Sequence, residues 1–176
     1  MSMRLNLCRL ACGAALGSAM ILAAQTVSDA DKKFVKEALQ GGNDEVQLGK
    51  LAQEKGSSAD VKSFGEKMVA DHTQMGEHMI QIAQQIGVSP PSGRSMSEKT
   101  LSTKLHALSG DSFDKSYIQA MIEDHKKDLA AFKQEVANGS DPAVKAAAEK
   151  GARVVASHLQ LAEQIAKSHN IEVSER

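Results

Sequence analysis

The sequence predicts an all-α protein whose long amphipathic helices pack into a bundle. Apolar residues recur at steps of three and four along the 176-residue chain, which is the spacing of one face of a helix. No segment shows the alternation of polar and apolar residues that is typical of a strand. Alanine, lysine, glutamate, glutamine and methionine are plentiful, and all of them favour helix. The length suits one domain with a substantial core.

Clusters of glycine, proline and asparagine divide this pattern into four long helices and one short helix. We expect helices over residues 28–55, 58–86, 97–108, 111–137 and 142–169. Ser28 and the acidic residues after it cap the first helix, and Gly56 stops it. The Gly41–Gly42 pair lies inside this helix and is a place where it can kink. Gly87 ends the second helix.

The clearest break in the chain follows the second helix. It reads "GVSPPSGRS" over residues 87–95, and its Pro90–Pro91 pair cannot continue a helix. The stretch "SGDS" then caps the third long helix. The stretch "NGSDP" ends it and starts the fourth, with Asp141 as the cap and Pro142 in the first turn.

The lengths of the connections predict the topology. The first two long helices, and the last two, are each joined by only a few residues, so each pair forms an antiparallel hairpin. About 23 residues join the two pairs. Because a helix of this length is roughly 40–45 Å long, that connection can cross the whole bundle and leave the second and third long helices parallel. Two hairpins joined by one long crossover, here containing a short helix, form the ferritin-like four-helix bundle.

The first 25 residues have the features of a signal peptide. Arg4 and Arg9 precede an apolar run of about 15 residues, which is short for a membrane span. We expect cleavage between about residues 24 and 30, export to the periplasm or elsewhere in a bacterial envelope, and a mature bundle over residues 28–170. An uncleaved membrane anchor is the alternative. Both cysteines of the chain lie in this segment, so the mature domain would contain no disulfide.

Charge and composition exclude several classes of partner. Without Arg4 and Arg9 the chain has 19 basic and 22 acidic residues, which gives no reason to expect nucleic acid or an anionic membrane as a partner. Four Phe, one Tyr and no Trp are few for a carbohydrate platform or a base-stacking site. A protein partner and the oligomeric state are not predicted by these features.

A five-residue phrase occurs twice, as "MVADH" at 68–72 and "MIEDH" at 121–125. His72 and His125 each fall in the middle of the apolar stripe of their helix. His158 in the fourth long helix and Glu45 in the first occupy equivalent positions. The second and third long helices are expected to be parallel, and the first and fourth to run the other way. All four groups are therefore expected at one level of the bundle, within about one turn, or roughly 6 Å.

Glu45, His72, His125 and His158 together form a plausible set of ligands for one transition metal ion, such as Zn, Cu or Fe. Asp71 and Asp124 directly precede the repeated histidines, and from there each is expected to accept a hydrogen bond from an imidazole of the other half of the bundle. The alternative is a buried His–Glu–Asp hydrogen-bond network without a metal.

The remaining histidines and the methionines have simpler interpretations. His78, His106 and His169 fall off the stripes or near helix ends and are expected at the surface. The methionines of the second and third long helices have helical spacing and are expected to fill the core rather than bind copper. They are Met68, Met75, Met79 and Met121.

Four segments of the chain resemble a known bacterial family. They are "FVKEALQGGNDEVQLGKLA", "VKSFGEKMVADH", "SYIQAMIEDHKKDLAAF" and "ASHLQLAEQIA", and together they extend from about residue 30 to 169. In order and spacing they are similar to the envelope family called domain of unknown function 4142. The resemblance implies an exported ferritin-like four-helix bundle without an established activity. The E-x-x-H motif of di-iron bundles is missing, so we expect any metal to be single.

These observations favour a periplasmic protein that binds one transition metal ion for sequestration, stress protection or structure. The alternative is a non-enzymatic envelope-stress or protein-interaction module, in which the inward polar groups only set the register of the helices. A small-substrate oxidoreductase that uses the metal is a weaker third hypothesis, because no catalytic motif accompanies the histidines.

Overall fold

The computed structural model describes residues 27–173 and confirms an all-α fold. The expected signal peptide lies outside the described residues. Five helices follow one another, each within two residues of its predicted bounds. They are α1 (Asp29–Lys55), α2 (Ala59–Gln85), α3 (Met96–His106), α4 (Gly110–Asn138) and α5 (Pro142–Ser168).

Side-chain caps fix where α1, α3 and α5 begin, whereas Ser58 and Ser109 make no such bond at the starts of α2 and α4. The Ser28 side chain accepts a hydrogen bond from the Asp31 N–H and the Asp31 carboxylate accepts one from the Ser28 N–H, which forms a capping box at the start of α1. The Asp141 carboxylate accepts hydrogen bonds from the first N–H groups of α5, where Pro142 occupies the first turn. The Gly41–Gly42 pair does not interrupt α1, which is helical from Asp29 to Lys55.

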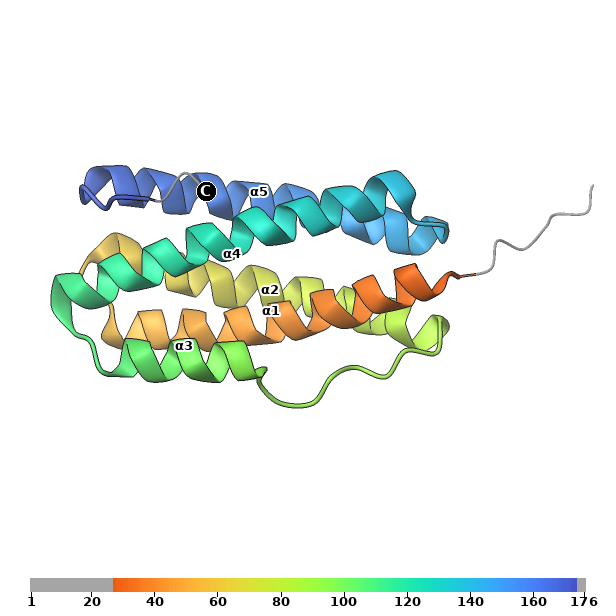
Figure 1. Ribbon diagram of the computed structural model, residues 1–176, viewed down its shortest axis with the longest axis horizontal. Coiled ribbons are helices and arrows are strands. Elements are labelled where there is room, and N and C mark those ends of the chain that lie inside the picture. Colours follow the sequence, from red (N-terminus) through yellow and green to blue (C-terminus); the bar gives the residue numbers. More distant parts are fainter. Residues whose placement is uncertain (1–26, 174–176) are drawn as a thin grey trace, which may run out of the picture.

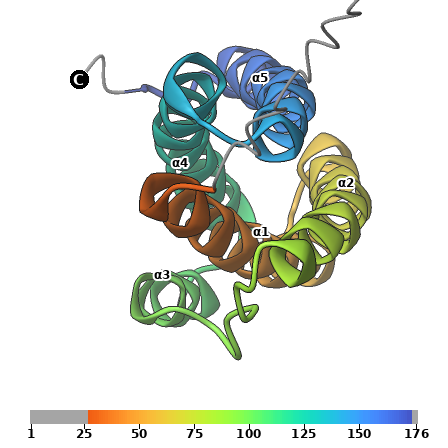
Figure 2. The ribbon, with the colours of Figure 1, turned by 90° about the vertical axis from the view of Figure 1, so that its right-hand side faces the viewer.

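The four long helices form the predicted ferritin-like bundle (Figures 1 and 2). The hairpin of α1 and α2 packs against the hairpin of α4 and α5, and α2 and α4 run in the same direction. Each long helix contacts two antiparallel neighbours, because α1 also packs on α4 and α2 on α5. The crossover carries α3 back along the outside of the bundle, against α1 and α4 (Figure 2). The long connection therefore crosses the bundle and leaves α2 and α4 parallel, as its length predicts.

The core consists of two apolar clusters separated along the bundle by a polar layer. One cluster surrounds Phe64 and Tyr117, and the other surrounds Phe34 and Phe132. On every long helix one ionisable residue with an exposed fraction of 3% or less lies between the segments that enter these two clusters. These residues are Glu45, His72, His125 and His158. The structure thus confirms that the four groups share one level of the bundle.

Methionines contribute to both clusters, as expected. Met68 and Met121 are fully buried in the first cluster, Met79 is buried in the second, and Met75 packs against the edge of the second. Thioether side chains fill irregular gaps well, which suits the space beside a layer of rings.

Two buried aspartates hold the hairpins together reciprocally. The carboxylate of Asp31 in α1 accepts hydrogen bonds from the N–H groups of Ser140 and Asp141, at 2.9 and 3.1 Å, in the turn between α4 and α5. The carboxylate of Asp114 in α4 accepts them from the N–H groups of Ser57 and Ser58, both at 2.8 Å, in the turn between α1 and α2.

Both the aspartates and the turns they hold are 83 positions apart, and "GSSADVK" at 56–62 matches "GSDPAVK" at 139–145 in this register. The two hairpins are therefore related by an internal repeat, which was not among the expectations from the sequence.

Helices α1 and α2 approach each other most closely at a pair of glycines. A Cβ atom added to Gly65 would lie 2.7 Å from the carbonyl oxygen of Gly49 and 2.9 Å from the Cβ of Ala52. A Cβ atom added to Gly49 would lie 2.8 Å from the carbonyl oxygen of Gly65. Backbone cannot move aside as a flexible side chain can, so this contact requires glycine on both helices.

We expect Gly65→Ala to lower the free energy of unfolding by about 1–3 kcal/mol, because the added methyl group separates the two helices. Gly76→Ala is the matched control in the same helix, since a Cβ atom there meets nothing within 4 Å. That substitution should stabilise the protein by up to about 1 kcal/mol through helix propensity. Chemical denaturation of both variants measures the difference. Equal effects of the two substitutions would contradict the close approach.

Candidate metal centre

Three imidazoles meet in the middle of the bundle. His72 comes from α2, His125 from α4 and His158 from α5, and their exposed fractions are 3%, 0% and 0%. One ring nitrogen of each lies within 4.8 Å of one from each of the others. Their ring centroids are 5.1 to 5.9 Å apart. The histidines of the repeated phrase, His72 and His125, therefore lie close together, and α5 adds His158 as the third ring.

His125 and His158 each use one ring nitrogen to donate a hydrogen bond to an oxygen atom at the edge of the layer. The Nδ1–H of His125 donates to the carbonyl oxygen of Met121, at 2.9 Å, so the proton is on Nδ1. The Nε2 atom of His158 lies 2.7 Å from Oδ2 of Asp71. Hydrogen bonds from Lys67 and His158 outweigh the opposing effect of burial and lower the pKa of Asp71, so its carboxylate accepts and His158 donates. These bonds orient the rings, as expected around a metal.

The third ring contacts Glu45. The Nδ1 atom of His72 lies 3.1 Å from Oε2 of this buried carboxyl group, and Nδ1 of His125 lies 3.3 Å from its Oε1. Burial, and then the nearby charges of Asp128 and Asp124, raise the pKa of Glu45 well above its usual value. Glu45 thus touches two rings on their Nδ1 sides and does not belong to the group of mutually close ligand atoms.

This geometry changes the role expected for Glu45. It was expected to be a ligand together with the three histidines, because it occupies the same level on its helix. The structure places it behind His72 and His125, where it can orient them. Residues that share a level need not share a centre, because their reach depends on how each helix is rotated about its own axis.

The other nitrogen of each ring is left without a partner. His72 Nε2, His125 Nε2 and His158 Nδ1 are all buried, and none of them has a hydrogen-bond partner among residues 27–173. A buried polar atom without a partner costs about 1–3 kcal/mol. Each of the three neighbouring rings thus keeps one nitrogen that is free to bind a ligand.

The rings are also in the form that binds metals. Burial, followed by repulsion from the neighbouring imidazoles, lowers the pKa of His72 to about 3. Burial and His158 lower the pKa of His125 to about 4. Burial lowers the pKa of His158 as well, although Asp71 opposes this shift. All three imidazoles are therefore neutral at neutral pH, and a neutral imidazole offers a lone pair to a metal ion.

Of the two aspartates expected beside the rings, only one is found there. Asp71 reaches His158 across the bundle, as described above. Asp124 instead lines a pocket between α1, α3 and α4 together with Asp44 and Asp128. None of the hydrogen bonds of the described chain connects Asp124 to an imidazole, so that expectation was wrong. Each aspartate lies about 100° around its helix from its histidine, and this rotation turns Asp71 toward α5 but Asp124 toward α1.

The remaining histidines are exposed, as expected. His169 pairs with Asp60, at 2.7 Å, and His106 contacts the Ser102 carbonyl oxygen, at 2.8 Å. Lys67 was not expected at this site, but it binds Asp71 at 2.8 Å and helps to keep it ionised. Their spacing of four residues on one helix is the signal that could have revealed this pair.

Comparisons with known proteins agree with the fold. The sequence model of a family described as "Domain of unknown function (DUF4142)" matches residues 17–165. No curated protein sequence matches the chain. Among the described residues, no helix is both long and apolar enough to cross a membrane.

Solved structures with the same fold come from proteins of low sequence identity. A DUF305 fragment from Deinococcus radiodurans is 15% identical, with a TM-score of 0.72 over 81% of this chain and 98% of that one. A putative secreted DUF305 protein from Streptomyces coelicolor is 15% identical, with a TM-score of 0.71 over 84% and 98%. CopM in the Cu(I)-bound form is 18% identical, with a TM-score of 0.65 over 78% and 96%. At these identities the similarity shows the fold alone.

Proposed function

This chain belongs to the DUF4142 family, for which no activity is established, and from that premise we propose that it is an exported protein that binds a single transition metal ion. The ligands are His72 Nε2, His125 Nε2 and His158 Nδ1. Glu45, Asp71 and the Met121 carbonyl group orient the three rings from behind. The protein holds the ion away from solvent, which suits sequestration or delivery better than catalysis.

One observation carries this proposal, namely that three mutually close imidazoles each keep one buried nitrogen without a hydrogen-bond partner in the described chain. A purely structural His–Glu–Asp network would be expected to satisfy its own members. Here the network satisfies only the outer side of the rings, and Oε1 of Glu45 also has no hydrogen-bond partner among the described residues. A metal ion bound by the three nitrogens would use the lone pairs that the network leaves free.

Copper(I) is the metal that we propose first. Imidazole binds Zn, Cu and Fe, but no carboxylate belongs to the close group of ligand atoms found in residues 27–173. A buried site of neutral ligands favours a monovalent ion over a divalent one, because less charge loses its hydration. The Cu(I)-bound state of CopM, which has the same fold, supports this choice.

Metal analysis tests the proposal directly. We expect the wild-type protein, loaded anaerobically with Cu(I) and desalted, to retain one ion per chain. His72→Ala should lose the ion, because three ligands become two, whereas His78→Ala should keep it, since His78 is exposed on the same helix. The same loading with Zn(II) ranks the two metals. A wild type that retains no more metal than His72→Ala would disprove the site.

A further inference from the structure

The metal centre lies beside a pocket that opens between the helices. We propose that Cu(I) reaches the three histidines through this pocket. Gly41 and Gly42 form its wall, and the thioethers of Met75 and Met79 serve as transient ligands. The inference rests on the proposed function and adds how the site is filled.

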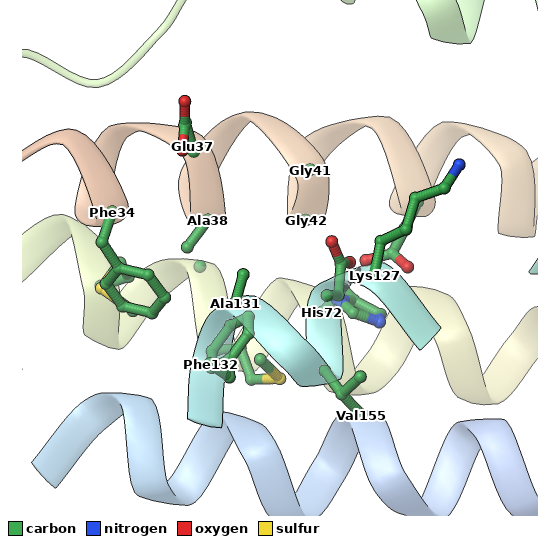
Figure 3. Close-up of a pocket in the computed structure, with 15 residues that line it drawn as sticks. Phe34, Glu37, Ala38, Gly41, Gly42, His72, Lys127, Ala131, Phe132 and Val155 are labelled. Atoms are coloured by element: carbon green, nitrogen blue, oxygen red, sulfur yellow. Dashed lines mark ion pairs between the residues drawn. The ribbon is translucent and has the colours of Figure 1, made fainter. Parts of the chain in front are cut away.

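A route is needed because the three rings are almost completely buried, with exposed fractions of 3%, 0% and 0%. A pocket of about 200 Å³ has residues from all four long helices in its lining and includes both Glu45 and His72. Figure 3 shows His72 beneath α1 close to Gly42, with Phe34 and Phe132 farther along the pocket. Two other pockets of the described chain contain none of the three histidines.

The glycine pair in α1 keeps this pocket open. A glycine inside a helix costs about 1 kcal/mol relative to alanine, and α1 has two in succession without a kink or a break. A Cβ atom added to Gly41 would meet nothing within 4 Å. A Cβ atom added to Gly42 would lie 3.8 Å from Nδ1 of His72. No close helix contact therefore requires either glycine. A larger side chain at either position would project into the pocket, which reaches the Nδ1 edge of His72 beside Glu45. An ion that enters here passes this edge of the ring to reach Nε2.

The lining of the pocket suits a soft cation. Met75 and Met79 follow His72 by three and seven residues, so the two thioethers and the imidazole lie along one face of α2. Thioether sulfur is a ligand that selects Cu(I). Glu37 adds an exposed carboxylate to the lining. A cation can thus be attracted by Glu37, held by sulfur and passed to nitrogen.

Stopped-flow transfer of Cu(I) from a weak chromophoric chelator to the protein tests the route. Leucine at Gly41 or Gly42 should slow loading on the order of tenfold, because the ion must then wait for local opening of the bundle. The final stoichiometry should stay at one ion per chain. Lys36→Leu is the control, because it places the same side chain at an exposed position of α1 outside the pocket. The Met75→Leu/Met79→Leu double variant should slow loading of Cu(I) but not of Zn(II).

The possible outcomes separate the two proposals. If the wild type and both glycine variants bind one ion at the same rate, the route is disproved while the metal site stands. If the double methionine variant loads Cu(I) at the wild-type rate, the thioethers are not part of the route. If the wild type binds no ion, the proposed function fails and this inference fails with it. Circular dichroism and the final stoichiometry show whether a variant that loads slowly is folded. If Gly42→Leu does not fold, Gly41→Leu is used as the test variant instead.

Discussion

Cu(I) is expected to raise the melting temperature of the wild-type protein, and alanine at any one of His72, His125 or His158 is expected to remove that rise. The ion binds only the folded state, in which the three nitrogens are together. At a free metal concentration about 100 times the dissociation constant this contributes about 2.7 kcal/mol, or about 5–10 °C in a protein of this size. Differential scanning calorimetry with and without the metal measures the effect.

Two conservative variants separate ligands from orienting groups. Glu45→Gln and Asp71→Asn keep the shape of the side chain but change the acceptor behind a ring. Because neither residue supplies a converging nitrogen, both variants should still bind the metal, with an affinity lowered by about 10–100-fold. Loss of all binding in Glu45→Gln would instead make Glu45 a ligand, as its position in the sequence first indicated.

The exposed His78 is the control for this series, and His78→Ala should show the full metal-dependent rise. A different pattern would support the structural alternative. In that case no metal would shift the melting temperature of the wild type, and each buried histidine variant would only destabilise the protein, by about 1–3 kcal/mol. The ring nitrogens would then be satisfied by solvent, and the proposed function would fail.

The second large effect is expected from the reciprocal aspartates. Asp31→Ala should leave the part-buried N–H groups of Ser140 and Asp141 without their acceptor and also remove the carboxylate half of the capping box of α1. We expect a loss of about 2–4 kcal/mol, or about 5–15 °C. Asp114→Ala should have a similar effect at the other end of the bundle, since it releases the turn at Ser57 and Ser58.

Asp29→Ala and Asp111→Ala are matched controls for these variants. Both residues are exposed acids in the first turns of α1 and α4, so their removal affects only the helix dipole. Each control should cost no more than about 1 kcal/mol. If Asp31→Ala is no more destabilising than Asp29→Ala, the contact between the two hairpins is not a source of stability.

The Asp31 contact also predicts acid sensitivity. Burial opposes ionisation, but hydrogen bonds from Ser140 and Ser28 outweigh it and place the pKa of Asp31 below its ordinary value of 3.8. A lowered folded-state pKa gives stability that is complete above the unfolded-state pKa and declines as pH falls below it. Denaturation curves between pH 5 and 2 should show this decline in the wild type and a smaller one in Asp31→Ala. If the free energy of unfolding declined equally with pH in both proteins, Asp31 would not be the source of the acid sensitivity.

Glu135 acts in the opposite direction at higher pH. It is buried beside Asp31, and burial, with the hydrogen bond and charge of Asp31, raises its pKa to about 7 from an ordinary value of 4.5. A raised carboxyl pKa gives stability that is complete below the unfolded-state pKa and is lost as pH rises through the folded-state value. The effect of Asp31 on stability should therefore be measured between pH 5 and 2, below the range in which Glu135 titrates in the folded protein.

Local patterns in the chain were sufficient to predict the helices and their order. The starts of α1 and α5 could be predicted from Ser28 and Asp141, whose side chains accept hydrogen bonds from N–H groups within the next few residues. The parallel arrangement of α2 and α4 follows from the length of one connection. The shared level of the four inward polar groups follows from counting residues at a constant rise along helices of known direction.

The roles of individual side chains depended on contacts between helices that are distant in the sequence. Glu45 and Asp124 were expected at the rings, but Glu45 lies behind two of them and Asp124 faces a different pocket. The close approach of Gly49 and Gly65, and the use of Asp31 and Asp114 for each other's turns, also join distant segments.

Hydrophobic periodicity indicates which face of a helix is buried, but only within a broad sector. A metal ligand must be placed far more accurately than that, because a few tens of degrees of rotation move a side chain from one neighbouring helix to another. The packing of both apolar clusters sets this rotation for all four helices at once. For that reason the repeated histidines could be recognised in the sequence, whereas which nitrogen of each ring is free is visible only in the folded bundle.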